Sequence, residues 1–361
     1  MSSVVKQPFY YLIILLLSFL FSCGSDPMSK ALESEKIAIG NVNQVIVLCE
    51  KDIWEGPLGD SLRFYYGASY LILPQPEPIF DLRHYTMMDL NKEPIRKELR
   101  TFLVIGDMND KYSDVSKLIK RDVGSEKLNQ AINSDGYGIS VARNKWARGQ
   151  TLVYIYGENE MKLAENITKS YPAITKKIHE TTKSVIEASA FAGGNNTKLA
   201  GEVFAKMKVK MRIPSSFYTA VSDEDIMWLR SETSSSSKNI LLTRVPYVDQ
   251  SQLTREGIKE IRNKLGKEYV SSTIPDSYMR INDVDLPLII NTIKFNGDYA
   301  IEARGIWDIV NDFMGGAFVS YLIYNPEKKD LLFMDCFIHA PQKDKRDMMQ
   351  ELEFILHTAT Y

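Results

Sequence analysis

The stretch Leu288–Trp307, with the sequence LIINTIKFNGDYAIEARGIW, decides the fold of the second half of the chain. Two runs rich in β-branched and aromatic residues flank the tripeptide Asn296-Gly297-Asp298. An Asn-Gly pair favours the positive φ angles that a tight hairpin turn requires. The stretch therefore predicts two antiparallel strands, over Leu288–Phe295 and Tyr299–Trp307.

The regions on either side of this hairpin are also rich in strand patterns. Apolar runs predict further strands over Lys206–Ile213, Met227–Ser231, Asn239–Val245, Phe318–Tyr324 and Leu331–His339. Thr254 can cap a helix over Arg255–Tyr269. A closing helix is expected because apolar residues form one stripe at Met348, Met349, Leu352, Ile355 and Leu356. This half is predicted to be a strand-rich α+β domain.

The first half of the chain alternates between strand and helix patterns. Strands are predicted over Gln44–Cys49, Arg100–Ile105, Tyr137–Ala142 and Thr151–Tyr156. Helices are predicted over Tyr112–Val123 and Glu158–Ala190, and Asp60 is expected to cap a helix that runs through Tyr66. This alternation indicates an α/β domain built around one sheet.

The cluster Phe191–Asn196 (FAGGNN) is the strongest break between the two halves. We predict a signal peptide over residues 1–22, a lipid-anchored tether over 23–43, and an N-terminal α/β domain over 44–190. A linker over 191–205 then leads to a C-terminal α+β domain over 206–361. The fold class is thus α+β with two sheet-and-helix halves. The element order of the second half is similar to the Mog1/PsbP-like fold.

The first residues have the layout of a secretory signal. Lys6 supplies a positive charge, Phe9–Phe21 is almost purely apolar, and Cys23 follows directly. A membrane-spanning helix needs about 20 apolar residues, so this run is too short to be a typical one. A short uncleaved anchor and a buried core helix are the alternatives.

Cys23 stands where the bacterial lipoprotein consensus places its cysteine. That resemblance implies cleavage before Cys23 and attachment of lipid, including palmitate, to this residue. Several acyl chains hold a protein stably on a membrane. We therefore expect a protein of the bacterial cell envelope, anchored to the outer membrane on its periplasmic face.

The composition is that of an ordinary globular protein. Hydrophobic residues make up 44%, charged residues make up 25%, and the formal net charge is -2. Basic residues are not concentrated in any segment, so nucleic acid is not an expected partner. Cys49 and Cys336 lie in strand-like runs in opposite halves, which favours two buried free thiols over a disulfide bond.

No established catalytic or metal-binding signature is present. The chain has no Gly-Xaa-Ser-Xaa-Gly elbow, no His-Glu-Xaa-Xaa-His, no phosphate-binding glycine loop and no cysteine pair at metal spacing. Its four histidines, His84, His179, His339 and His357, are scattered without ligand-like spacing. We expect no cofactor and no metal, and a non-catalytic role is favoured over an enzymatic one.

Several aromatic, proline and glycine motifs are the candidates for a binding surface. Gly315-Gly316 allows close backbone approach beside large aromatic residues, as a ligand site or as a structural turn. The proline-rich segment Leu73–Pro78 can be a recognition loop or a rigid connector. The candidate binding residues are Trp54, Gln75, Glu77, Trp228, Arg230, Arg304, Trp307, Gly315, Gly316 and Phe318.

Alternation along the predicted strand separates two of these candidates. Arg304 and Trp307 point to opposite faces, so Trp307 can lie over Gly315-Gly316 while Arg304 needs an acidic or aromatic partner of its own. Arg304 and Arg230 can each stack on an aromatic ring, pair with a buried acid, or line a pocket for an anion. We favour a structural role for Trp307 over a binding role.

In combination, the motifs resemble a known family. They are Trp54-Xaa-Gly56-Pro57-Xaa-Gly59-Asp60, Leu73–Pro78, Met227–Arg230, Arg304–Trp307 with Met314–Phe318, Ala340-Pro341 and Lys345-Arg346. Together they are similar to a family of Bacteroidota lipoproteins described as domain of unknown function 4837, over most of the mature chain. Ala317, Cys336 and His339 depart from that family's pattern, which argues against a family-wide catalytic role for Cys336 and His339. The resemblance implies an architecture and a location, but no activity.

Three functional hypotheses remain from the sequence. The favoured one is a membrane-anchored envelope lipoprotein that binds a protein or an envelope component without catalysis. The second is an envelope hydrolase or transferase with an unfamiliar site that uses Asp312, Arg304 or His339. The third is a carrier of a small ligand, with a pocket between the two halves.

Overall fold

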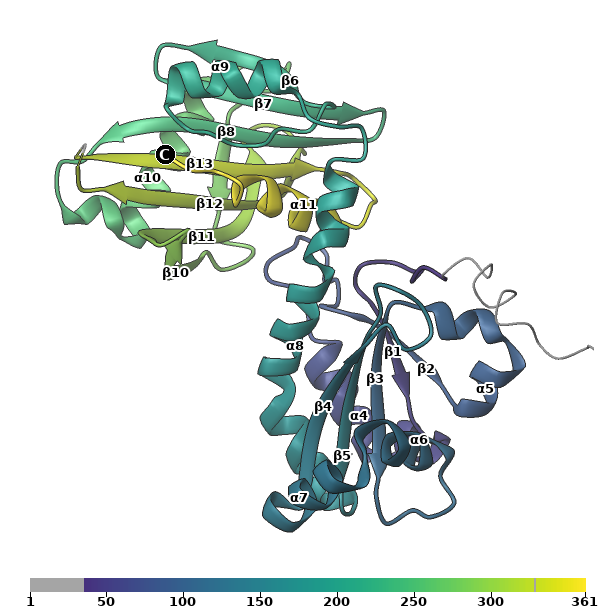
Figure 1. The fold of residues 1–361 in the computed structure, drawn as a ribbon. Coiled ribbons are helices and arrows are strands. Elements are labelled where there is room, and N and C mark those ends of the chain that lie inside the picture. The colour runs from purple at the N-terminus through teal and green to yellow at the C-terminus, as the bar shows by residue number, and fades with distance from the viewer. Residues whose placement is uncertain (1–35, 328) are drawn as a thin grey trace, which may run out of the picture.

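The computed structural model describes residues 36–327 and 329–361 (Figure 1). The predicted signal peptide, Cys23 and the first part of the predicted tether lie outside these residues. In the part that is described, no helix combines the length and the apolar composition needed to cross a membrane. Figure 1 shows two bodies, each built on its own sheet, with the helix α8 (Glu160–Ala190) running from one to the other.

The first domain contains a five-stranded sheet in the order β2-β1-β3-β5-β4. Its strands are β1 (Gln44–Leu48), β2 (Asp81–Tyr85), β3 (Thr101–Asp107), β4 (Tyr137–Arg143) and β5 (Thr151–Gly157). All neighbours are parallel except the edge strand β4, which runs antiparallel to β5. The strands β1, β3 and β5 are almost entirely buried, which explains their continuous apolar sequences.

Helices cover both faces of this sheet. The helices α4 (Pro57–Tyr66) and α8 pack on one face. The opposite face is covered by α5 (Met87–Lys92), α6 (Asp114–Val123) and α7 (Ser125–Asp135). Two short elements complete the domain, α3 (Lys51–Glu55) and the 3₁₀ helix η2 (Pro94–Glu98). The prediction that Asp60 caps α4 was wrong, because Pro57 occupies a first-turn position and Gly56 is the N-cap.

The second domain contains an eight-stranded sheet. Seven strands follow the order β10-β11-β12-β13-β8-β7-β6, and β9 pairs with β11. Every pairing in this sheet is antiparallel. The strands are β6 (Tyr218–Asp223), β7 (Ile226–Thr233), β8 (Ser236–Pro246), β9 (Met279–Asn282), β10 (Ile289–Phe295), β11 (Asp298–Ile309), β12 (Gly315–Asn325) and β13 (Asp330–His339).

The predicted hairpin is formed by β10 and β11. Asn296 and Gly297 connect these strands with positive φ angles of 50° and 108°. On one face of the sheet, α9 (Thr197–Met207) and α11 (Arg346–Leu356) close a core. On the other face, α10 (Arg255–Tyr269) packs with the neighbouring 3₁₀ helix η3 (Gln250–Leu253). The α+β class with a strand-rich second half is therefore confirmed.

The predicted linker over 191–205 is too long, and the predicted strand over Lys206–Ile213 does not form. The helix α9 buries Leu199 and Val203 in the core of the second sheet, so most of the supposed linker belongs to that domain. This helix ends at Met207, and Lys208 adopts the left-handed conformation that stops it. The apolar alternation after Lys208 reflects buried side chains in an irregular extended segment rather than a sheet strand.

The two domains are joined by more than α8. Leu73, in the proline-rich segment, is buried in the core of the second domain. The carboxylate of Glu77 accepts hydrogen bonds from the backbone N–H groups of Lys345 (2.7 Å) and Arg346 (2.9 Å), where α11 begins. The guanidinium of Arg346 donates to the carbonyl oxygen of Pro78 (2.6 Å) and forms an ion pair with Asp81 (2.8 Å).

Candidate functional site

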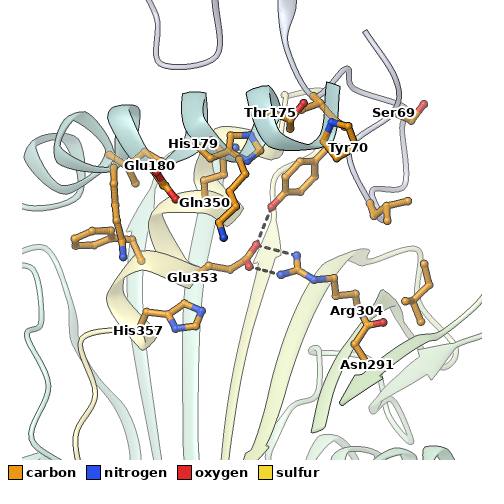
Figure 2. Close-up of a pocket in the computed structure, with 18 of the residues that line it drawn as sticks. Ser69, Tyr70, Thr175, His179, Glu180, Asn291, Arg304, Gln350, Glu353 and His357 are labelled. Carbon is orange, nitrogen blue, oxygen red and sulfur yellow. Dashed lines mark hydrogen bonds and ion pairs between the residues drawn. The ribbon is translucent and has the colours of Figure 1, made fainter. Parts of the chain in front are cut away.

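A cavity of about 770 Å³ lies at the junction of the two domains. Its walls come from α8, α11, the edge of the second sheet at β10 and β11, and the segment that begins at Ser69 (Figure 2). Pockets for small molecules usually occupy 300–1,000 Å³ and often lie between domains. The size and the position of this cavity are those of a ligand site.

Glu353 of α11 is the centre of a polar network in the cavity. Its carboxylate forms an ion pair with Arg304 of β11 and accepts a hydrogen bond from the hydroxyl of Tyr70 (2.7 Å), as Figure 2 shows. The hydroxyl of Tyr321 donates to the same carboxylate (3.3 Å). Arg304 also forms an ion pair with Glu302 (2.9 Å). The network thus joins three parts of the chain that are far apart in sequence.

Burial and charge shift the pKa values of these groups. Burial opposes the charged form of Arg304, but Glu353 and Glu302 outweigh that effect and raise the pKa of the guanidinium, so it stays charged. Burial also opposes ionisation of Glu302, yet Arg304 holds the pKa of this carboxyl below its usual value. Burial and the neighbouring Glu353 raise the pKa of Tyr70, which keeps its hydroxyl protonated as a donor.

Two histidines line the same cavity. Burial lowers the pKa of His179 on α8, whose Nε2 atom has no hydrogen-bond partner among the residues that the structure describes. The ring of His357, the C-cap residue of α11, stacks on Phe295, with 4.6 Å between ring centroids. Desolvation lowers the pKa of His357 against the opposing charge of Glu353. Both rings are therefore neutral near pH 7, and each can donate or accept a hydrogen bond.

Arg304 is the one predicted site residue that lines this cavity. It lies on the face of β11 opposite Trp307, and its partners are acidic, as the alternation along the strand required. Of the alternatives considered for Arg304, the structure supplies the acidic partners, and the residue also lines a pocket.

Trp307, Gly316 and Phe318 form part of the core instead of a surface, and Gly315 is half-buried beside them. Trp307 is only 3% exposed and pairs with Gly316 across the β11–β12 ladder. A Cβ atom added to Gly316 would lie 1.8 Å from the carbonyl oxygen of Ile338. Gly316 is therefore required by close backbone approach. Phe318 is buried and packs under the guanidinium of Arg262. The structural interpretation of this segment agrees with its burial, and the surface interpretation does not.

The other predicted residues lie in separate places. Trp54 in α3 stacks on His84 in the first domain, with ring centroids 5.2 Å apart. The indole of Trp228 donates to the side chain of Asn239 (3.0 Å), and Arg230 forms an ion pair with Glu232 (2.5 Å) on the second sheet. The predicted residues therefore do not form one continuous binding surface.

The proline-rich segment is a connector between the domains. Gln75 is exposed, whereas Glu77 is 8% exposed and caps α11. The hypothesis of a recognition loop is wrong for Glu77, because its carboxylate is occupied by two backbone N–H groups. Of the two hypotheses for this segment, the rigid connector agrees with these contacts.

Most residues that line the cavity lie outside the motifs that mark the sequence. Tyr70, Thr175, Lys183 and Glu353 belong to no motif, and His179 and His357 were treated as isolated histidines. Helical spacing was the available signal, since Thr175, His179 and Lys183 follow one another at intervals of four residues. Glu353 and His357 have the same spacing on α11. That spacing cannot reveal that the two helices face each other.

The two free cysteines, and the residues considered for an enzyme outside β11, lie away from the cavity lining. Cys49 and Cys336 are both free and buried. Burial raises the pKa of Cys49 to about 12 and also raises that of Cys336, so neither is a thiolate near pH 7. Asp312 and His339, considered for an enzyme, lie outside the cavity lining. Across residues 36–327 and 329–361, no cluster of three or more His, Cys, Asp or Glu residues could hold a metal ion.

Comparisons with solved structures return proteins that match the chain in part. A point mutant of the protein Mog1 is 11% identical, with a TM-score of 0.29, and the alignment covers 42% of this chain and 89% of that one. The Ran-binding protein Mog1p of Saccharomyces cerevisiae is 10% identical, with a TM-score of 0.29 and the same coverage. No curated protein matches the sequence.

Two family models divide the chain in the same way as its two sheets. Residues 38–190 match the family described as domain of unknown function DUF8532. The motifs quoted from the first half, Trp54–Asp60 and Leu73–Pro78, fall in that match. Residues 196–358, which contain α9, the whole second sheet and nearly all of the chain beyond it, match a different model. That model is the family described as domain of unknown function DUF4837.

Proposed function

We propose that this protein is a membrane-anchored, non-catalytic binding protein of the bacterial cell envelope, and that its ligand occupies the cavity between the two domains. The cavity supports the proposal most directly: about 770 Å³ of space lined by both domains has the size and the position of a typical ligand pocket. The proposed role combines the binding function favoured from the sequence with the pocket expected for a small-ligand carrier.

The arrangement of the reactive groups favours binding over catalysis. A hydrolase or transferase commonly needs a nucleophile next to a base, or a carboxylate free to take a proton. Glu353 accepts bonds from Arg304, Tyr70 and Tyr321. Such a carboxylate holds neighbouring elements in place and is poorly available as a base. The rigid lining suits recognition of a molecule that leaves unchanged.

The envelope location rests on the amino-terminal sequence alone. We propose that lipid on Cys23 holds the protein on the outer membrane, with both domains in the periplasm. Cys23→Ala should abolish labelling by radioactive palmitate and move the protein to the soluble fraction. Cys49→Ala is the matched control, because it removes a buried thiol elsewhere and should leave labelling unchanged. Retention and labelling of Cys23→Ala in the membrane would contradict the anchor.

The binding role is tested by filling the cavity. Ile289→Trp places an indole on the β10 wall, and Ile139→Trp is a matched control on the exposed edge strand β4. Native mass spectrometry of the full chain, purified from its bacterial membrane, should detect a bound small molecule in the wild type and in Ile139→Trp. Ile289→Trp should lack it. Absence of any such molecule from all three proteins would contradict the proposal.

A further inference from the structure

The ligand class depends on which polar groups in the cavity remain available. The carboxylates are already paired with cations: Glu353 and Glu302 with Arg304, and Glu180 with Lys177 (3.3 Å). Glu353 also receives the hydroxyls of Tyr70 and Tyr321. A cationic ligand would have to displace these partners. The acidic groups are therefore structural, and they argue against a positively charged ligand.

The available groups lie together on α8. Among the described residues, Lys176 and Lys183 have no carboxylate within ion-pair distance, although both line the cavity. The hydroxyl of Thr175 and the Nε2 atom of His179 are buried without a hydrogen-bond partner. These four residues occupy one side of α8, because Lys176, His179 and Lys183 follow one another at intervals of three and four positions, and Thr175 lies four positions before His179.

These groups are mainly hydrogen-bond donors. A lysine ammonium only donates, whereas a hydroxyl and a neutral imidazole can donate or accept. Leaving a buried polar group without a partner costs free energy. A ligand that offers acceptors to Thr175 and His179 removes that cost and therefore binds more tightly. The two unpaired lysines add positive charge on the same side. A negatively charged, acceptor-rich group fits this side of the cavity.

Much of the remaining lining is apolar. Side chains from both domains contribute, namely Leu71, Ile79, Tyr171, Ile186, Ile289 and Phe354. Burial of apolar ligand surface against them supplies most of the binding free energy in such a site. A small inorganic anion would leave this surface uncovered, so the ligand needs an apolar body as well as an acidic group.

We propose that the cavity binds an amphipathic organic anion, whose acidic group lies against Lys176, His179 and Lys183 and whose apolar body lies against α11 and β10. This inference rests on the proposed function, since it names the ligand class of the same cavity. The acidic group can belong to a free molecule or to a lipid headgroup, and the two sources share this chemistry.

Three water-soluble probes of equal shape test the charge. They are naphthalenesulfonate, the neutral naphthalenemethanol and the cationic naphthalenemethylammonium. Each is titrated calorimetrically into the full chain held in phosphatidylcholine nanodiscs. The sulfonate should bind most tightly, and the ammonium should bind most weakly. Tighter binding of the neutral or cationic probe would overturn the anion proposal while leaving the cavity as the site. Absence of binding by all three would count against the cavity itself.

Substitutions locate the acidic group. Lys176→Gln/Lys183→Gln should weaken sulfonate binding about fivefold or more, since each exposed ion pair contributes up to about 1 kcal/mol. Binding of the neutral probe should be unchanged. Lys264→Gln is the control, because Lys264 is exposed on α10, on the opposite face of the second sheet and outside the cavity lining, and should alter neither affinity. Equal affinities for the sulfonate in all three proteins would overturn the placement.

A competition experiment separates the two sources of the anion. Phosphatidylglycerol vesicles that displace bound naphthalenesulfonate would assign the acidic group to a lipid. Displacement by decanoate but not by the vesicles would assign it to a free molecule. Failure of both competitors to displace the sulfonate would overturn the proposal that an amphipathic anion is the natural class of ligand.

Discussion

Trp307 is fully enclosed by neighbouring side chains and backbone. It is 3% exposed and packs edge-on against Phe337, with ring centroids 5.6 Å apart. Within the described part of the chain its Nε1 atom has no hydrogen-bond partner, so the indole contributes through packing. Trp307→Ala should lower the free energy of unfolding by about 3–5 kcal/mol, as large-to-small changes in cores do.

Thermal melts of the wild type and Trp307→Ala measure this effect. Trp54→Ala is the comparison, because Trp54 is only half-buried and should cause a smaller loss. An unshifted melt for Trp307→Ala would show that the indole is dispensable for stability, and would return Trp307 to the list of binding candidates.

The histidines of the cavity predict a pH dependence of stability. Burial lowers the pKa of His179 and His357 below their ordinary value of 6.5 in the folded state. Between the lowered value and 6.5, the unfolded chain binds more protons than the folded one. The free energy of unfolding should therefore fall as the pH drops below about 6.5. Above that pH, both states are neutral at these rings and the effect vanishes.

Chemical denaturation at about pH 7 and about pH 5 tests this expectation. The fall in unfolding free energy should be smaller in His179→Gln/His357→Gln than in the wild type. This window lies above the ordinary carboxylate values of 3.8 and 4.5, which limits the contribution of Asp122 and Glu302. An identical fall in both proteins would show that other groups control the response.

At the scale of single residues, the sequence predicts the face of a strand on which a side chain lies better than it predicts what surrounds that side chain. It placed Arg304 and Trp307 on opposite faces of one strand, because side chains in a strand alternate. It favoured a structural role for Trp307 but could not identify what covers the indole, since burial depends on α10 and β13, which approach from elsewhere in the chain. For the same reason, Glu77 looked like part of a surface motif although Lys345 and Arg346 bind it.

The helix α11 is capped at its N-terminus by a residue from a distant part of the chain. Its N-cap residue, Lys345, supplies no side-chain cap, and Glu77 accepts the first free backbone N–H groups instead. Glu77→Ala should lower the free energy of unfolding by about 2–3 kcal/mol, because it removes charged hydrogen bonds and a cap.

Denaturation and hydrogen exchange measure the loss of this cap. The amides of Lys345 and Arg346 should exchange faster in Glu77→Ala, while those in the middle of β12 keep their protection. Gln75→Ala should change stability by no more than about 0.5 kcal/mol, because Gln75 is exposed. Unchanged exchange at Lys345 in Glu77→Ala would contradict the role of Glu77 as a cap.

Elements with strong local signals were predicted well. The helix α10 begins after Thr254, whose side chain accepts from the backbone N–H of Gly257, and the β10–β11 hairpin has the expected Asn-Gly turn. The failures lie where packing decides. The alternating residues after Lys208 looked like a strand but only fill the core beneath α9 and α11. Local patterns therefore predicted elements, and they did not predict which apolar segments pair.

The cavity exists only in the whole molecule. Four parts of the chain meet there: the segment that begins at Ser69, α8, the strands β10 and β11, and α11. The first and last residues of the lining, Ser69 and His357, lie far apart in the sequence. The sequence could suggest a pocket between two halves, but not its walls. Those walls depend on how the domains are held together, and the contacts of Arg346 test that arrangement.

Arg346 joins α11 to the first domain through a buried guanidinium. It donates to the carbonyl oxygen of Pro78 (2.6 Å) and to Asp81 (2.8 Å), and it also contacts Asp347. Arg346→Met keeps an apolar stem of similar length and removes these bonds. The packing inside each core stays as it is. The loss of these charged hydrogen bonds should therefore lower the free energy that couples the unfolding of the two domains by about 2–3 kcal/mol.

Scanning calorimetry of the full chain should then show the heat-absorption peak of Arg346→Met broaden or divide, because each domain can unfold without the other. Arg280→Met is the matched control: Arg280 also binds an aspartate through two nitrogens, but it is 54% exposed and far from the junction. Its peak should keep the wild-type shape. If Arg346→Met instead keeps a single peak at the wild-type temperature, Leu73 and α8 suffice to hold the domains together. The cavity would then owe its shape to apolar packing rather than to the ion pairs around α11.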